Sequence, residues 1–185
     1  MDMQNDWQFD QPFDLIHAGL IFTLQIDWRR LMHQAYANLR PGGWLEFQEY
    51  GLPIRVAEGT DPESASALWA DAFPRALNGI GHNWEHARKF DEYMTEAGFV
   101  DVRVESFRVC YGDWSENPRE RASGILYDNE VNTRMSTLFG SILIKGLGWA
   151  PAVAHAIWNE RHQEALEGKA KIWHDHIVIY GRKPE

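Results

Sequence analysis

The sequence has a single cysteine, Cys110, among its 185 residues. One cysteine cannot form a disulfide within the chain, and a reducing compartment is its simplest setting. A secretion signal is also lacking, because residues 1–6 are polar and acidic and no apolar stretch follows them. These two absences predict a cytoplasmic protein.

Long apolar runs and an excess of positive charge are missing as well. The most apolar region, residues 138–149, is interrupted by Lys145 and by glycines. It falls short of the roughly 20 residues that a helix needs to cross a bilayer, so no membrane partner is expected. The chain has 18 Lys and Arg against 27 Asp and Glu, and its formal net charge is -9. Such a surface repels phosphate backbones, so no nucleic-acid partner is expected either.

Aromatic residues, in contrast, are abundant, with nine Trp, nine Phe and six Tyr. Side chains of this size most often fill a core, but they can also line a pocket for a bulky apolar small molecule. Composition alone leaves both interpretations open. Because the sequence has no internal repeat, linker or low-complexity tract, residues 1–185 are predicted to form a single domain.

The start of the chain predicts a strand, a helix and a second strand. Residues 13–19 (FDLIHAG) have the pattern of a short buried strand. Asp27 is placed to cap the N-terminus of a helix over residues 28–39, which ends at the turn sequence after it. The next strand is expected over residues 44–48. Two strands joined in this way favour a parallel, right-handed crossover.

The remainder predicts a loop over residues 52–61 and then mainly helices. Helical patterns cover four ranges: 62–77, 84–96, 117–147 and 151–167. Pro74 is expected to bend or end the first of these helices. A strand is predicted over 100–111, with a bulge or a break near Ser106 because the apolar alternation slips there. The last strand is expected over 171–180.

Six stretches of the sequence form a set: Phe13–Ala18, Asp27–Leu31, Asn38–Glu49, Glu96–Val102, Leu147–Trp149 and Tyr180–Pro184. Their sequences and their order along the chain resemble those of the LaeA-like class I methyltransferases of filamentous fungi. The resemblance implies an α/β fold, a truncated class I methyltransferase (Rossmann-like) sheet corresponding to strands four to seven, with flanking helices. It also implies a role in secondary metabolism. Gly19 departs from the family, which usually has an arginine there.

The resemblance further implies that the half that binds S-adenosylmethionine (SAM) is missing. In the family, the first three strands carry a glycine-rich loop and an acidic residue that hold this cofactor. Such a loop follows a strand, so that the backbone can approach the ligand closely. The two glycine pairs present here, Gly79-Ile80-Gly81 and Gly146-Leu147-Gly148, each follow a predicted helix. We therefore expect no bound cofactor.

Polar residues at the carboxyl ends of the two parallel strands are the catalytic candidates. His17 lies near the end of the first strand, and Glu49 and Tyr50 end the second. Ligands of open parallel sheets bind beyond these ends. A histidine, a carboxylate and a phenol can transfer a proton or donate a hydrogen bond. Each of them can equally be a structural or rim residue.

Other polar and aromatic residues are candidates for contact with a substrate or for metal binding. The residues expected to contact a substrate are His82, Asn83, Trp84 and Trp149. His174 and His176 share one face of the last strand, a spacing that suits two metal ligands. No further ligand pattern completes the set, so no metal site is predicted.

Three functions remain open. The preferred one is a SAM-independent, repurposed enzyme of fungal secondary metabolism, a natural-product cyclase of the pericyclase or Diels–Alderase type. It would act by folding a bulky apolar small molecule and donating hydrogen bonds to it. The second is a non-catalytic module that binds a methyltransferase or a regulatory partner. The third is a fragment of an active SAM-dependent methyltransferase.

A homodimer is also expected, through the exposed strand edge at Phe13–Gly19. A sheet that lacks three of its strands leaves this edge with unpaired backbone groups, and a second chain is the simplest cover. The alternative cover is the chain's own N-terminal segment or an internal helix.

Overall fold

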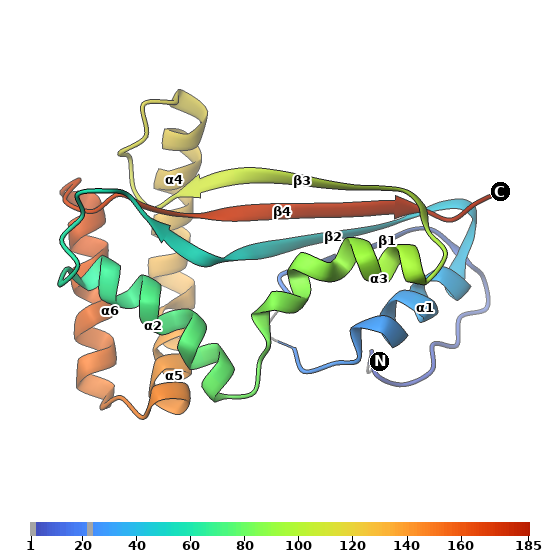
Figure 1. The fold of residues 1–185 in the computed structure, drawn as a ribbon, viewed down its shortest axis with the longest axis horizontal. Helices are drawn as coiled ribbons and strands as arrows, with labels where there is room; N and C mark the ends of the chain where they lie inside the picture. Colours follow the sequence, from blue (N-terminus) through green and yellow to red (C-terminus); the bar gives the residue numbers. More distant parts are fainter. Residues whose placement is uncertain (1–2, 22–23) are drawn as a thin grey trace. The chain divides into compact units, whose positions relative to one another are not determined.

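The computed structural model describes residues 3–21 and 24–185. A four-stranded sheet has the order β1-β2-β4-β3 (Figure 1). Its strands are β1 (Phe13–Gly19), β2 (Leu39–Val56), β3 (Val100–Cys110) and β4 (Ile172–Arg182). The α-helices are α1 (Trp28–Asn38), α2 (Ala65–Gly79), α3 (Phe90–Glu96), α4 (Pro118–Glu130), α5 (Ser136–Leu147) and α6 (Pro151–Leu166). A 3-10 helix, η1 (Trp84–Lys89), precedes α3, and a π-helix, η2 (Val131–Met135), joins α4 to α5.

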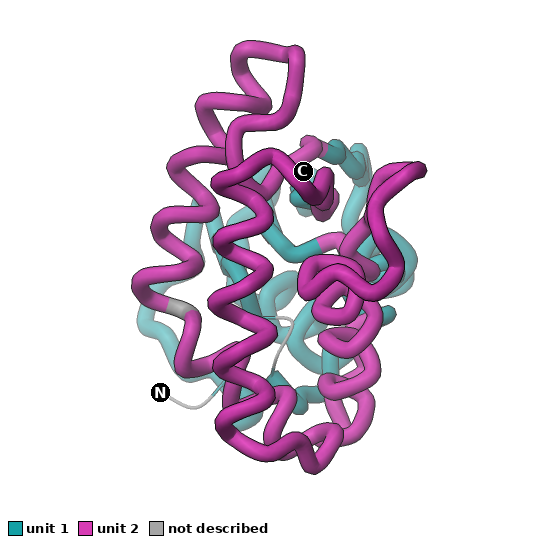
Figure 2. The backbone as a smooth tube through the Cα atoms, turned by 90° about the vertical axis from the view of Figure 1, so that its left-hand side faces the viewer, with its two compact units in different colours: residues 1–50, 85–106, 176–185 teal, residues 51–84, 107–175 magenta. Residues whose placement is uncertain are grey.

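The chain forms two compact units (Figure 2). Unit 1 consists of residues 1–50, 85–106 and 176–185, and unit 2 consists of residues 51–84 and 107–175. Strands β2, β3 and β4 each contribute residues to both units. The single domain inferred from the sequence stays a prediction.

The predicted crossover opens unit 1. Strands β1 and β2 pair in parallel, with Ile16 opposite Leu45. Helix α1 connects them and begins after Asp27, whose Oδ1 accepts a hydrogen bond from the backbone N–H of Arg30 at 3.0 Å. This cap satisfies a donor that the first turn of a helix leaves open. The strand, the cap and the parallel pairing are thus confirmed, and the right-handedness of the crossover stays a prediction. The expected burial of the strand is wrong, because each residue of β1 is half-buried or exposed.

Helices α1 and α3 lie on the same side of the strands in unit 1 (Figure 1). Buried side chains of both helices pack against Leu45 and Phe47 of β2. The ring of Phe47 lies 4.9 Å from that of Phe90 on α3. Leu45 and Phe47 are two residues apart, so they point to the same face of the strand. This packing gives unit 1 its hydrophobic core.

Two of the family-like stretches meet in unit 1. Lys183 donates hydrogen bonds from Nζ to the carbonyls of Tyr36 and Leu39, both at 2.8 Å. The Tyr36 carbonyl also accepts from the backbone N–H of Leu39, so Lys183 holds the point where α1 ends and β2 begins. The N–H of Gly42, which has a φ of 76°, donates to the carbonyl of Lys183 at 2.9 Å. Glycine suits that backbone conformation. The turn predicted after α1 is wrong, because β2 begins directly at Leu39. The first residues of β2 and the C-terminal tail are therefore one structural contact.

The N-terminal segment packs against α1. The backbone N–H of Trp7 donates to Oε1 of Gln34 on α1 at 2.9 Å. Met3 and Trp7 both contact the core of unit 1. Strand β1 remains an end strand in the sheet order, and Leu15 on it is 57% exposed.

Unit 2 contains α2, α4, α5 and α6 and an aromatic core. The ring of Trp69 on α2 lies 5.7 Å from that of Trp158 on α6. Phe73 on α2 lies 4.9 Å from Phe139 on α5. All four side chains are buried. Many of the aromatic residues therefore fill a core, which is the first of the two interpretations that composition left open.

The loop predicted over residues 52–61 is wrong in its first part. Strand β2 continues to Val56. Leu52 and Ile54 are buried while Pro53 and Arg55 are exposed. This alternation is that of a strand with one packed face. It continues beyond residue 48, where the predicted strand ends.

Three other predicted boundaries also differ. Pro74 does not end α2, which continues to Gly79 because fully buried residues such as Phe73 and Leu77 anchor it on both sides of the proline. The helix predicted over 117–147 is interrupted by η2. Strand β3 is continuous from Val100 to Cys110, so the break expected near Ser106 is absent from it, and the alternative of a bulge stays a prediction.

Candidate functional site

His17 and Glu46 form a hydrogen-bonded pair on the neighbouring strands β1 and β2. The two residues are partners in the parallel register, and Nδ1 of His17 lies 3.0 Å from Oε1 of Glu46. Gln48 donates to the same carboxylate oxygen at 3.0 Å. A neutral imidazole that donates from Nδ1 to a carboxylate presents Nε2 as an acceptor. Because the His17 side chain is 46% exposed, this nitrogen can reach a ligand.

Glu49 and Tyr50 were predicted to end the second strand, but both lie within β2, which continues to Val56. Glu49, the predicted partner of His17 in catalysis, is fully buried. Its Oε1 accepts a hydrogen bond from the backbone N–H of Ile21 at 3.0 Å. Next to it, the N–H of Leu20 donates to the carbonyl of Gln48 at 2.8 Å. Glu49 therefore fixes the segment that follows β1, and its catalytic role stays a prediction.

The pleat of β2 distributes the candidates over two faces. Leu45 and Phe47 are buried under α1 and α3, and side chains along a strand alternate between faces. Glu49 continues the Leu45 and Phe47 row. His17 lies with Glu46 on the opposite face, and Tyr50, which is buried, continues that second row. The structure thus groups His17 with Glu46 and places Glu49 on the other side.

The candidate substrate contacts lie in unit 2, in two connections between helices. His82 follows α2, its N–H donates to the carbonyl of Leu77 at 2.9 Å, and burial lowers the pKa of its imidazole. Asn83 comes next, and Trp84 is the first residue of η1. Trp149 lies half-buried between α5 and α6. Their contact with a substrate stays a prediction.

The glycine pairs bring these two connections together. A methyl group built on Gly79 would overlap the carbonyl of Gly146, and one built on Gly146 would overlap the carbonyl of Ala76. The ends of α2 and α5 therefore meet backbone to backbone. Each pair was predicted to follow a helix, but its first glycine lies within the last turn of that helix. Gly79 and Gly146 serve helix packing, so they are not available to approach a cofactor.

The two histidines of the last strand differ in their surroundings. His174 is buried in unit 2, where its ring lies 4.9 Å from that of Tyr127. His176 belongs to unit 1, and burial lowers its pKa. Across residues 3–21 and 24–185, no three His, Cys, Asp or Glu side chains gather in a way that could hold a metal ion. The same part of the chain has no helix long and apolar enough to span a bilayer.

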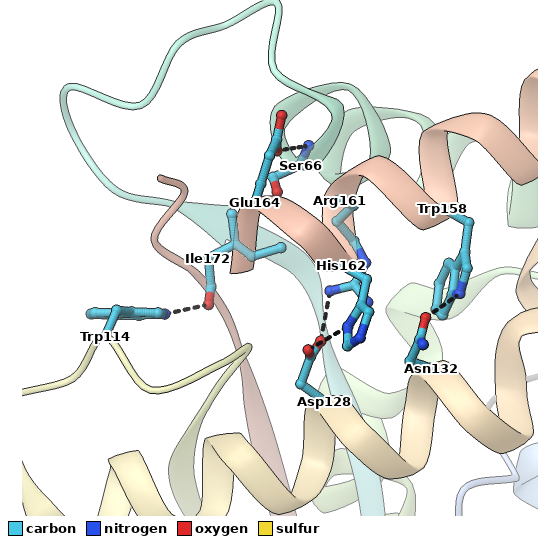
Figure 3. Close-up of polar contacts among 9 residues, drawn as sticks. All are labelled: Ser66, Trp114, Asp128, Asn132, Trp158, Arg161, His162, Glu164 and Ile172. Atoms are coloured by element: carbon cyan, nitrogen blue, oxygen red, sulfur yellow. Dashed lines mark hydrogen bonds and ion pairs between the residues drawn. The ribbon is translucent and has the colours of Figure 1, made fainter. Parts of the chain in front are cut away.

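Unit 2 contains an ionic cluster of Asp128, Arg161 and His162 (Figure 3). The sequence did not lead us to predict it. Nη1 of Arg161 donates to Oδ1 of Asp128 at 2.9 Å, and Nδ1 of His162 lies 2.7 Å from Oδ2 of the same carboxylate. The Arg161 guanidinium also lies 4.7 Å from the ring centroid of Trp158. A signal was present in the sequence, because Arg161 falls in the buried row of α6 between Trp158 and Ala165. A charge in such a row requires a buried partner.

Comparison with known proteins agrees with this fold. Residues 1–104 match the sequence profile of the Methyltransferase domain family. The chain is 30% identical over 184 residues to the methyltransferase pytC of Aspergillus terreus, covering 99% of this chain and 57% of that protein. It is 23% identical over 188 residues to the secondary metabolism regulator laeA of Aspergillus flavus, covering 99% of this chain and 50% of the regulator. A methyltransferase-like protein of Bacillus halodurans with a solved structure superimposes with a TM-score of 0.52 at 14% identity, covering 100% and 70% of the two chains.

These matches show which family the chain belongs to. The chain spans about half the length of the curated relatives it matches. The Bacillus structure shows the fold alone. The resemblance to fungal secondary-metabolism proteins of the methyltransferase type is confirmed, and the truncation of the sheet stays a prediction. The chain belongs to the Methyltransferase domain family and has its class I, Rossmann-like α/β fold with a mixed four-stranded sheet.

Proposed function

We propose that residues 1–185 bind a bulky apolar small molecule of fungal secondary metabolism and convert it without SAM, as a cyclase. The observation that carries this proposal is the use of Gly79 and Gly146 in helix packing. The connection from β1 to α1, residues 20–27, contains no glycine, and that from β2 to α2, residues 57–64, contains one. A cofactor held between a strand and a helix needs close backbone approach at such a connection, which a glycine-rich loop provides. Neither connection has a glycine-rich sequence.

His17 supplies the chemistry in this proposal. With Nδ1 held by Glu46, its Nε2 can accept a proton or, once protonated, donate a hydrogen bond to a substrate carbonyl. The hydrogen bond to Glu46 fixes the orientation of the imidazole ring. A carbonyl polarised in this way activates a conjugated alkene toward ring closure, and the cyclisation itself transfers no atom to the protein. Holding the substrate in a folded conformer lowers the entropic part of the barrier.

A second function draws support from the names of the relatives. The pytC protein is named a methyltransferase, and this chain spans 57% of its length. In this alternative, residues outside these 185 hold SAM, and His17 positions the group that receives the methyl. The third candidate, a non-catalytic module for a methyltransferase or regulatory partner, predicts no turnover at all.

Deletion of the gene and analysis of the accumulated metabolite would supply the substrate. The purified chain is then incubated with that metabolite in the presence and absence of SAM. A cyclase gives a product isomeric with the substrate, at the same rate in both reactions. A product that carries an added methyl group, or no conversion in either reaction, overturns the proposal.

We also propose that β1 pairs with β1 of a second copy. Support comes from its end position in the sheet order and from the exposed Leu15. Light scattering behind a sizing column tests this at micromolar concentration. A dimer mass that Leu15→Lys converts to a monomer mass supports the proposal, and a monomer mass for the parent chain refutes it.

A further inference from the structure

The outer edge of β3 borders an open groove in unit 1. The groove has a volume of about 470 Å³. It is lined by Asp91, Glu92, Thr95 and Glu96 of α3 and by Val102 and Val104 of β3. Strand β3 is the last strand in the sheet order, with β4 as its one neighbour among the described residues. Its outer backbone groups over residues 100–106 therefore form a template on which another strand can pair.

The floor of the groove is apolar. Val104 is 51% exposed, and Val102 beside it packs against the core of unit 1. β-branched side chains in a row are a surface on which a neighbouring strand packs well. The charged residues next to these valines are Asp101, Arg103 and Glu105, and the alternation of the strand places them on its opposite face. There Asp101 pairs with Arg182 at 3.0 Å, and Glu105 accepts a hydrogen bond from Tyr180 at 2.7 Å. On the face of Val102 and Val104, β3 itself therefore presents no charge beside the two valines.

The wall of the groove is acidic. Glu96 pairs with Arg29 at 2.7 Å. The carboxylates of Asp91 and Glu92 make no hydrogen bond or ion pair with any residue in the described ranges. Two uncompensated negative charges above an apolar floor favour a cationic partner. They disfavour a second copy of this chain at this edge, because its own α3 would bring carboxylates toward these.

We propose that this groove binds an extended peptide segment of another protein, with Lys or Arg at every second position, as a strand added beside β3. Alternate side chains of a strand point to one face, so the basic residues would all enter the groove. Their aliphatic stems would lie on Val102 and Val104 while their charged ends reach Asp91 and Glu92. Backbone hydrogen bonds to residues 100–106 would add affinity.

The probe is a capped synthetic peptide of alternating threonine and lysine, titrated into the whole chain by calorimetry and by amide NMR. We expect saturable binding that weakens with added salt, with the largest amide shifts in residues 100–106. Two matched peptides are controls. One carries glutamate in place of lysine, and the other is N-methylated where its amides would face β3. Neither is expected to bind.

Two variants of the chain locate the site. Asp91→Lys combined with Glu92→Lys is expected to weaken binding by about tenfold or more, since two attractive pairs become repulsive. Glu116→Lys, an exposed change in unit 2, is the control and should have little effect. Equal binding of the N-methylated peptide, equal loss in the control variant, or shifts confined to other residues overturns the proposal. A parent chain that already pairs with itself through residues 100–106 also overturns it.

Discussion

Arg161 and Asp128 form an ion pair at 2.9 Å in the interior of unit 2, where the two side chains are 0% and 2% exposed. The pair joins α6 to α4 next to the π-helix η2. Close by, Nε1 of Trp158 donates to Oδ1 of Asn132, a residue of η2, at 2.9 Å. These contacts fix one arrangement of the two helices, because a shift of either would leave a charge buried without a partner.

We expect Asp128→Asn to lower the free energy of unfolding by about 3–5 kcal/mol, the usual cost of breaking a buried pair from one side. Urea unfolding measures it. The double change Asp128→Leu with Arg161→Met should cost clearly less, because no uncompensated charge remains. A double variant that is as unstable as the sum of its singles would contradict this.

The contact between α2 and α5 predicts a contrast between two glycines of the same helix. Gly146→Ala should destabilise the chain by about 1–3 kcal/mol or more, because the new methyl overlaps the carbonyl of Ala76. Gly140→Ala is the control. The nearest atom to its methyl is Cε1 of His155 at 3.8 Å, so the change should be neutral or stabilising by up to about 1 kcal/mol. Thermal and urea unfolding of both variants would show whether the order holds.

Acid is expected to weaken unit 1 through two histidines. Burial, with Lys89 and Arg29 adding to it, lowers the pKa of His86, and burial lowers that of His176. The unfolded chain then binds more protons below about pH 6.5, so this part of the stability is present above that pH and falls as pH decreases. Unfolding free energies from about pH 7.5 to about pH 5 should fall less steeply in His86→Gln combined with His176→Gln. An unchanged slope would show that these histidines do not contribute.

The pair of His17 and Glu46 predicts a graded loss of activity on the accumulated substrate. His17→Ala should reduce turnover by about tenfold to a thousandfold, the range for losing a proton-transfer or electrostatic group. Glu46→Gln should cost less, since the imidazole keeps a hydrogen-bond partner. Glu58→Gln, on the exposed loop after β2, should match the parent. Parent rates in both site variants, with folding verified, would place the chemistry elsewhere.

The sequence was most informative where local chemistry decides the structure. Residues 13–19 form the predicted strand, and Asp27 caps α1 as its side chain requires. The expectation that Pro74 ends α2 is wrong, because burial of its neighbours outweighs the hydrogen bond that a proline removes, and a bend there stays a prediction. The partner of His17 was missed because Glu46 is set by the register between strands, which periodicity within one strand does not contain. Asp128 was missed because it meets Arg161 only through the packing of α4 on α6.

The proposal that these 185 residues convert their substrate without SAM is tested most directly by calorimetric titration of SAM into the purified, folded chain. We expect no saturable heat, because the glycines that could approach the cofactor are used where α2 meets α5. Saturable binding of SAM at low micromolar concentration, with one site per chain, would contradict it.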